Sequence, residues 1–485
     1  MDEPTGKTYR PWEPQKYAAQ AHSPGSTLPE GDLVYFLLDV IPKLDLAKFY
    51  AHYEKETRGA PPFDPGMMVC LLIYSYCMGV FSSRKIATAC ERNLAFLAIV
   101  GEDRPDFRTI SDFRKIHLAA FSELFVQVLR LAGEAGMVKL GNIAIDGTKV
   151  KANASRHKAM SYGYMQKEVE RLRAEIDQLL HQAEQADSEQ DATLGASRGD
   201  ELPDELKRRQ ERLEKIEAAM KRLEEQSKAK AEAERQRREQ AEVDRTRDGG
   251  KGRGPKSKPV TETPAAKDQT NFTDPTTRIM QNNSKGWDYC GNAQASVDSE
   301  HQVIVAADVT VQANDKQQAG PMARSTRANL EQAGIAIPQN EAAEPQDIPA
   351  TLDSGYFSDS AVEQVEAAGF DPHIAVGRQR HHQASPSEPD AAASPEGSSP
   401  HATAKQKMSQ KLQTPEGKQC YAKRKGIVEP VFGQLKGVRG FRQFLLRGLN
   451  NIRAEWRLIC LTHNLLKIWR HRRVSQNVPL HCSGP

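Results

Sequence analysis

The sequence predicts a mixed α/β fold, with a sheet flanked by helices and an all-helical region in front of it. Residues 28–135 carry apolar positions at helical spacing, and the chain after Ile427 does so again. Between them lie the short apolar runs NIAID, IPATLD and HIAVG, and two alternating segments, WDYCGNAQASVD and HQVIVAADVTV, that are typical of paired strands. The order is strand, insertion, two strands, helix, strand, helix, strand, loop and helices, which indicates one mixed sheet closed by C-terminal helices.

The chain is long enough for more than one domain. Its 485 residues could form two or three, and a hydrophobic content of 38% is low for a single compact globule. We therefore expect parts of it to be solvated or extended. The predicted regions are an irregular tail at 1–27, a helical domain at 28–135, a core at 136–158 and 266–473, a charged helical insertion at 159–246, a flexible linker at 247–265, a disordered loop at 379–416 and a tail at 474–485.

The charged insertion carries two apolar traces at heptad spacing. One includes Leu172, Ile176 and Leu179, and the other includes Leu213 and Ile216. The pattern predicts a coiled-coil-like helical hairpin with a thin apolar seam. The hairpin could pack on itself or on a second copy, or be a solvated helix pair, and the sequence leaves these alternatives open.

Charge is distributed unevenly although the net charge is only +3. From Lys418 to Arg473 there are fourteen Lys and Arg residues and two acids, Glu429 and Glu455. Such a segment favours a polyanionic partner, the alternative being a solvated basic helix face. The helices of residues 28–135 resemble a helix-turn-helix module, and a plain helical bundle fits the same pattern.

Cysteine usage and the longest apolar run both favour the cytoplasm. The seven cysteines are odd in number and scattered, and none has zinc-knuckle spacing, so they read as small core hydrophobes in a reducing compartment. The N-terminal text MDEPTGKTYRPWEP lacks the apolar core of a signal peptide. Residues 67–80 are too short for a membrane span, so we expect a buried helix there and no membrane partner.

Three carboxylates stand where an apolar strand ends or a helix begins. They are Asp146, Asp353 and Glu429. Each alone is more often a turn or capping residue. Together, delivered by core elements far apart in sequence, they could converge on divalent metal ions, and a metal pair that bridges a phosphate suits in-line phosphodiester chemistry. The acids Asp274, Asp298, Asp308 and Asp315 are not expected to be metal ligands.

The text around these acids resembles a known family. AIDGTKVKANAS, DSGYFS and YAKRKGIVEPVFGQLKGVRGFRQFLLRG resemble what the DDE transposases of bacterial insertion sequences, with their RNase H-like catalytic domain, place around the first Asp, the second Asp and the Glu. DPGMMVCLLIYSY and TISDFRK resemble the family's N-terminal helical domain. The resemblance implies that Asp146, Asp353 and Glu429 are catalytic and bind two Mg²⁺ ions, with Mn²⁺ as a substitute.

The family's signature around the Glu is Tyr, two residues, Arg, three residues, Glu, six residues, Lys. Glu429 and Lys436 keep this spacing, and Tyr421 and Arg424 keep theirs. Four residues separate Arg424 from Glu429, so Lys425 is an alternative for the basic position. The resemblance implies that Tyr421, Arg424, Lys425 and Lys436 contact DNA phosphates.

The resemblance implies a DNA transposase that cleaves insertion-sequence ends and joins the 3′-OH to target DNA by two-metal phosphodiester hydrolysis and transesterification. The expected partners are DNA with terminal inverted repeats, target DNA and a second copy in a synaptic homodimer, in the bacterial cytoplasm and close to the nucleoid. The alternatives are a stand-alone or domesticated metal-dependent nuclease and an inactive DNA-binding scaffold protein.

Overall fold

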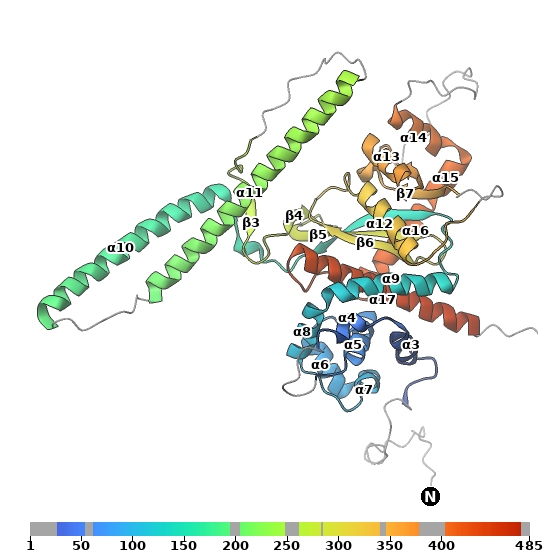
Figure 1. Cartoon of the computed structure of the whole chain (residues 1–485), viewed down its shortest axis with the longest axis horizontal. Coiled ribbons are helices and arrows are strands. Elements are labelled where there is room, and N and C mark those ends of the chain that lie inside the picture. Colours follow the sequence, from blue (N-terminus) through green and yellow to red (C-terminus); the bar gives the residue numbers. More distant parts are fainter. Residues whose placement is uncertain are drawn as a thin grey trace, which may run out of the picture. The chain divides into compact units, whose positions relative to one another are not determined.

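The computed structural model describes residues 27–53, 62–194, 204–247, 261–282, 285–339, 346–377 and 403–476. Of the tails predicted at 1–27 and 474–485, residues 1–26 and 477–485 lie outside these ranges, whereas residues 474–476 end a C-terminal helix. Most of the linker predicted at 247–265 also lies outside the described ranges. The chain divides into two compact units, one of Met1–Ala152, Gln281–Gly286 and Cys290–Pro485 and one of Asn153–Met280 and Trp287–Tyr289. The predicted mixed α/β fold is confirmed, with its N-terminal helices and its helical insertion (Figure 1).

A mixed sheet is the centre of the first unit. Its strands are β1 (Ile143–Lys151), β5 (Trp287–Asp298), β6 (Ile304–Thr310), β7 (Ile348–Leu352) and β8 (Phe370–Ile374). They pair in the order β6-β5-β1-β7-β8, and the sixth strand of the sheet, β4 (Arg278–Gln281), also pairs with β5. β5 is antiparallel to both β1 and β6, whereas β1, β7 and β8 run parallel. The parallel half of the sheet therefore ends its strands at one common edge.

β1 is longer than the sequence predicted. The apolar run NIAID suggested a strand that ends at Asp146, yet the strand continues to Lys151. It does so because β5 pairs with all nine residues, from Ile143 opposite Asp298 to Lys151 opposite Cys290. Asp146 therefore lies within a strand and not at its end.

Four of the N-terminal helices start at a side-chain cap. Asp32, Asp64, Asn93 and Asp106 each accept a hydrogen bond from a backbone N–H of the first turn, which satisfies a donor that the helix cannot. The elements are α3 (Leu33–Val40), η1 (Ile41–Lys43), α4 (Ala47–Tyr50), α5 (Pro65–Cys77), α6 (Ser83–Arg92), α7 (Leu94–Val100), α8 (Phe107–Ile116) and α9 (Leu118–Glu134).

The apolar helix α5 is buried on almost every side, as its sequence predicted. Within the described ranges, no single helix is long and apolar enough to cross a membrane, and only α8 and α9 taken together, bent by 71°, meet that criterion.

The N-terminal helices share their core with the C-terminal helix α17 (Leu449–Gln476). The Cys77 thiol of α5 contacts the Thr462 carbonyl at 3.6 Å, and the rings of Phe81 and Phe441 lie 5.2 Å apart. Gly79 has a φ of +75°, and a Cβ there would lie 2.6 Å from the Arg439 carbonyl oxygen. The two backbone segments therefore approach each other at a point where only glycine fits. The boundary between residues 28–135 and the core stays a prediction.

Helices flank the sheet, and one of them corrects a prediction. They are α12 (Ala319–Gln332), α13 (Asp359–Ala367), α14 (Ala404–Gln413), α15 (Pro415–Ala422) and α16 (Arg424–Gly433), with the short turns η3 (Ser354–Tyr356) and η4 (Gln434–Val438).

The predicted disordered loop at 379–416 is wrong for its last part, because α14 lies within it. Thr403 and Gln406 form a capping box at the start of α14. Met408 is buried, and its sulfur accepts the Ile374 N–H at 3.5 Å. The polar composition of this segment gave no sign of a helix, which packs on the core through the side chain of Met408. Residues 379–402 of the prediction lie outside the described ranges.

The second unit contains the predicted hairpin, formed by α10 (Tyr162–Leu194) and α11 (Asp204–Arg247) (Figure 1). Met165, Val169 and Leu172 of α10 form one apolar seam with Ile216 and Leu223 of α11. The seam is therefore closed within one chain, which favours the hairpin that packs on itself. The same unit contains η2 (Arg156–Lys158), β2 (Ala159–Ser161), β3 (Gln269–Asn271) and β4 (Arg278–Gln281).

A buried carboxyl group of α17 lies in the core. Glu455 accepts hydrogen bonds from the backbone N–H groups of Leu445 and Leu446, at 3.0–3.2 Å, and its side chain is fully buried. Burial raises the pKa of Glu455 to about 7, although these N–H groups and Arg114 favour the charged form.

We expect Glu455→Gln to gain stability relative to the wild type as the pH rises. The pKa of Glu455 in the folded protein lies above the usual 4.5. The wild-type carboxyl therefore stabilises the folded state fully below about pH 4.5, and this stabilisation is lost as the pH approaches 7. The loss is on the order of 3 kcal/mol. Urea unfolding of both proteins between pH 4.5 and 8 measures it, and a difference in unfolding free energy that stays constant with pH would contradict this account.

Candidate active site

Asp146 lies within β1, and Asp353 is the residue directly after the parallel strand β7. Ile145 pairs with Leu352 in the last pair of this ladder, and the next residue of each segment is an aspartate. Adjacent strands lie about 4.8 Å apart. Each carboxylate also accepts a hydrogen bond from the next backbone N–H, at 2.8 Å from Gly147 and 2.6 Å from Ser354. The register of β1 and β7 thus produces a pair of acids.

The electrostatics of Asp146 reflect this pairing. Burial raises its pKa above the usual value, and the charge of Asp353 raises it further, whereas the Arg424 guanidinium and the Gly147 N–H oppose the shift. Like charges on adjacent strands are costly without a cation nearby. Hard oxygen donors in such a field fit a divalent cation such as Mg²⁺.

Arg424 supplies one cation. It is the first residue of α16, its guanidinium Nη1 lies 3.0 Å from Asp146 Oδ2, and its side chain is only 9% exposed. The guanidinium also lies over the Tyr421 ring, 6.0 Å from its centroid. Lys425 is exposed. Of the two candidates for the basic position of the signature, Arg424 is therefore the one at the carboxylates.

Lys436 follows the same face of β1. It lies in η4, a π-helical turn, and its ammonium donates to Thr148 Oγ1 at 2.8 Å and to the Lys149 carbonyl at 3.0 Å. Thr148 is two residues beyond Asp146, and alternate residues of a strand share a face. Lys436 therefore extends the site along β1, away from Arg424.

Glu429 is not grouped with the two aspartates. The face of α16 toward the core consists of Arg424, Ile427, Val428 and Val431, and Glu429 is exposed. It is rotated by about 100° from Val428 around the helix. No three His, Cys, Asp or Glu side chains form a metal-binding group in the part of the chain that the structure describes. Two of the three predicted ligands are thus together, and the third is on the adjoining helix.

Sequence reasoning passed over a polar cluster on the other face of β1, centred on Gln294 and Asp315. Asn292, Gln294 and Ser296 alternate along β5 and are fully buried. Polar residues with period two in an otherwise apolar strand were the signal that could have found it.

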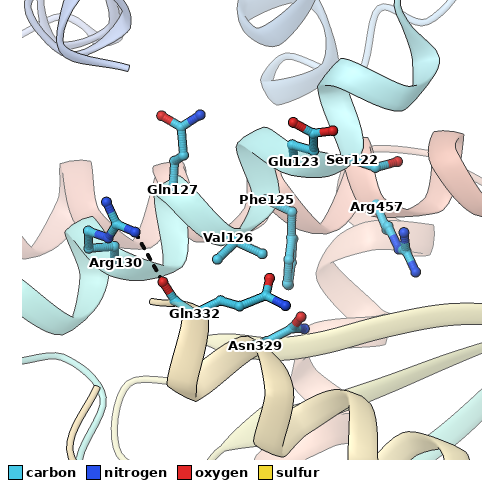
Figure 2. Close-up of a pocket in the computed structure, with 9 residues that line it drawn as sticks. All are labelled: Ser122, Glu123, Phe125, Val126, Gln127, Arg130, Asn329, Gln332 and Arg457. Atoms are coloured by element: carbon cyan, nitrogen blue, oxygen red, sulfur yellow. Dashed lines mark hydrogen bonds between the residues drawn. The ribbon is translucent and has the colours of Figure 1, made fainter. Parts of the chain in front are cut away.

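A separate cavity of about 540 Å³ lies between α9, α12 and α17 (Figure 2). Arg130 closes one side by donating to the Gln332 carbonyl at 3.0 Å, and Glu123, Asn329 and Arg457 also line it. None of the predicted site residues lines this cavity. It is therefore a different feature from the carboxylate pair.

Two family models match this chain. The one described as "Transposase domain (DUF772)" matches residues 23–116, which include α3 to α8. The one described as "Transposase DDE domain" matches residues 396–469, which include Tyr421, Arg424, Glu429 and Lys436. No curated protein and no solved structure matches the chain.

Asp146 and Asp353 lie outside both matched segments. They come from the sheet that the matched segments enclose in sequence, and its mixed topology agrees with an RNase H-like domain. A transposase domain toward one end and a DDE transposase domain toward the other support an insertion-sequence DDE transposase.

Proposed function

We propose that this transposase cuts DNA at the ends of an insertion sequence and joins the freed 3′-OH to target DNA at the Asp146–Asp353 pair. The register of β1 with β7 supports this most directly, because the last pair of the ladder, Ile145 with Leu352, is followed in each segment by an aspartate. In cleavage, water attacks the scissile phosphorus and the bond to the 3′ oxygen breaks, with a proton passing to that oxygen. In joining, the 3′-OH attacks a target phosphodiester, and the target's 3′ oxygen leaves and takes up the proton.

The family generally uses divalent metal ions. For this chain we propose Mg²⁺, with Mn²⁺ as a substitute, held by Asp146 and Asp353. When bound, such a pair of ions stabilises the charge on the attacking and leaving oxygens. Glu429 is the proposed third carboxylate, since it lies in the matched DDE segment and on the helix whose Arg424 contacts Asp146.

The proposed phosphate contacts are Tyr421, Arg424, Lys425 and Lys436. Arg424 and Lys436 border the carboxylate pair from opposite ends of one helical segment, and Lys425 is exposed beside them. Cations at these points suit a DNA backbone that passes over β1.

We also propose that the N-terminal helices read the terminal inverted repeats, with α6 as the contact helix. Arg84, Lys85 and Arg92 are exposed on α6, whereas Ile86 and Cys90 are buried. The guanidinium carbons of Arg84 and Arg108 lie 5.1 and 5.7 Å from the centroid of the half-exposed Phe107 ring. A helix with one apolar and one basic face that follows a buried helix and a short turn suits DNA recognition.

Asp146→Asn should abolish cleavage, by at least about 100-fold, because the amide keeps the shape and loses the charge that holds a cation. Binding to element ends should not change. Asp308→Asn is the matched control. Asp308 lies on the edge strand β6, and its ion-pair partner is Arg453 of α17. Gel-shift and nicking assays with Mg²⁺ measure both properties, and cleavage retained by Asp146→Asn would refute the assignment. A strand-transfer assay separates a transposase from a stand-alone nuclease.

Charge removal at α6 and at η4 should have different effects. Arg84→Ala with Lys85→Ala should weaken binding to element ends and reduce its salt dependence by about two charges. Lys436→Ala should slow cleavage of bound ends more than it weakens binding. Titrations at several salt concentrations and single-turnover cleavage measure these effects, and an identical loss in both variants would contradict the division of roles.

We propose that two copies act together, because transposition joins two element ends, and closed two-fold dimers are the commonest assembly. The end-bound complex should have the mass of two chains in analytical ultracentrifugation. A mass of one chain per pair of ends would exclude the dimer. A two-chain mass that survives removal of α10 and α11 would assign the dimer contact to another part of the chain.

A further inference from the structure

A buried polar network lies on the face of β1 opposite to Asp146. Gln294 Nε2 donates to Asp315 Oδ1 at 2.8 Å and to Asn292 Oδ1 at 3.0 Å. Asn292 Nδ2 donates to the same Asp315 oxygen at 2.6 Å, and the Tyr356 hydroxyl donates to Gln294 Oε1. Asn292 and Gln294 are fully buried and Tyr356 is 1% exposed. Every polar atom of the Gln294 amide thus has a partner.

The network depends on a missing side chain in β1. Gly147 is the partner of Gln294 in the β1–β5 register, so both point to the same face of the sheet. A Cβ at Gly147 would lie 2.2 Å from Gln294 Nε2 and 3.0 Å from Asn292 Oδ1. Glycine at this position therefore leaves the space in which Gln294 reaches from β5 across β1.

The far end of the network is the turn that carries Asp353. Tyr356 follows Asp353 by three residues, and its backbone N–H donates to the Asp353 carbonyl at 3.0 Å within η3. The bond from its hydroxyl to Gln294 ties this turn to β5. Asp315 lies close as well, since a Cβ on Gly355 would be 3.9 Å from its Oδ2, and Lys149 Nζ is 3.8 Å from its Oδ1.

We propose that Gln294, Asp315 and Tyr356 are positioning residues that fix Asp353 relative to Asp146. They act through the turn and not on the substrate. The inference rests on the proposed function of the carboxylate pair. Functional side chains must be held within about 0.5 Å of their working positions. β7 pairs with β1 only as far as Leu352, so Asp353 itself gains no support from that ladder. The polar network supports Asp353 from the face of the sheet opposite to Asp146.

Tyr356→Phe tests this directly, because it removes only the hydroxyl. We expect the single-turnover cleavage rate at saturating DNA to fall by about 10-fold or more, as for other groups that orient metal ligands. The affinity of the DNA-free protein for Mn²⁺, measured by calorimetry, should fall by a similar factor. The dissociation constant for element-end DNA should stay within about twofold, since no DNA contact is lost.

Tyr76→Phe is the matched control. Tyr76 is also a fully buried tyrosine whose hydroxyl binds one polar side chain, Arg114 Nη1 at 3.0 Å, in the N-terminal helices. It should lose thermal stability as Tyr356→Phe does, without the loss of Mn²⁺ affinity or of cleavage rate. Equal losses in both variants would indicate a general effect of destabilisation and overturn the inference.

Two further variants separate the possible failures. Asp315→Asn keeps the size of the side chain and weakens its acceptor, so it should show the same pattern and decides the question if Tyr356→Phe does not fold. Asp353→Ala should eliminate cleavage. If it cleaves normally, the proposed function of the pair fails. If it is inactive while Tyr356→Phe and Asp315→Asn match the wild type in rate and Mn²⁺ affinity, only the positioning role fails.

Discussion

The parallel pairing of β1 with β7 is the constraint on which the site depends. Because Ile145 lies opposite Leu352, two aspartates that are more than two hundred residues apart each follow directly after the last pair of this ladder. A slip of one residue would send one carboxylate to the other face of the sheet. The apolar cores on both sides of β1 oppose such a slip, since Ile143, Ala144 and Ile145 are all buried. The hydrophobic pattern of a short strand thus sets the electrostatics of the site.

The C-terminal helices combine packing with charge. Arg424 and Lys436 face β1, but several other basic residues of the same segment bind the protein itself. Arg439 donates to the Thr462 hydroxyl and the Ile459 carbonyl, and Arg453 and Arg457 donate to carbonyls of the edge strand β6. A basic stretch in the sequence is therefore only partly a DNA surface, because long side chains also satisfy buried or edge carbonyls. The exposed cations of α6 and α16 are better candidates for contact with the DNA backbone.

The two faces of β1 carry different groups of side chains. One face presents Asp146 and Thr148 to α16 and η4, and the other holds the amides of Asn292 and Gln294. Gly147 separates these environments within a single strand. The amides of Asn292 and Gln294 are fully buried and paired, so each lost bond would leave a buried group unsatisfied, whereas Asp315 is partly exposed. Through Tyr356, this network contacts the turn at Asp353, which β7 no longer supports because its pairing with β1 ends at Leu352.

The sequence by itself determined the fold class, the paired strands, the hairpin and the acids worth considering, because periodicity and turn residues act locally. It also ended β1 too early and missed α14, since strand length depends on a partner and Met408 finds its contact only in the folded chain. Only the tertiary structure decided that Arg424 and not Lys425 meets Asp146, that Glu429 lies outside the pair, and that Gln294 reaches Tyr356. These are relations between side chains on different elements, and they follow from register and helix rotation, which no local pattern specifies.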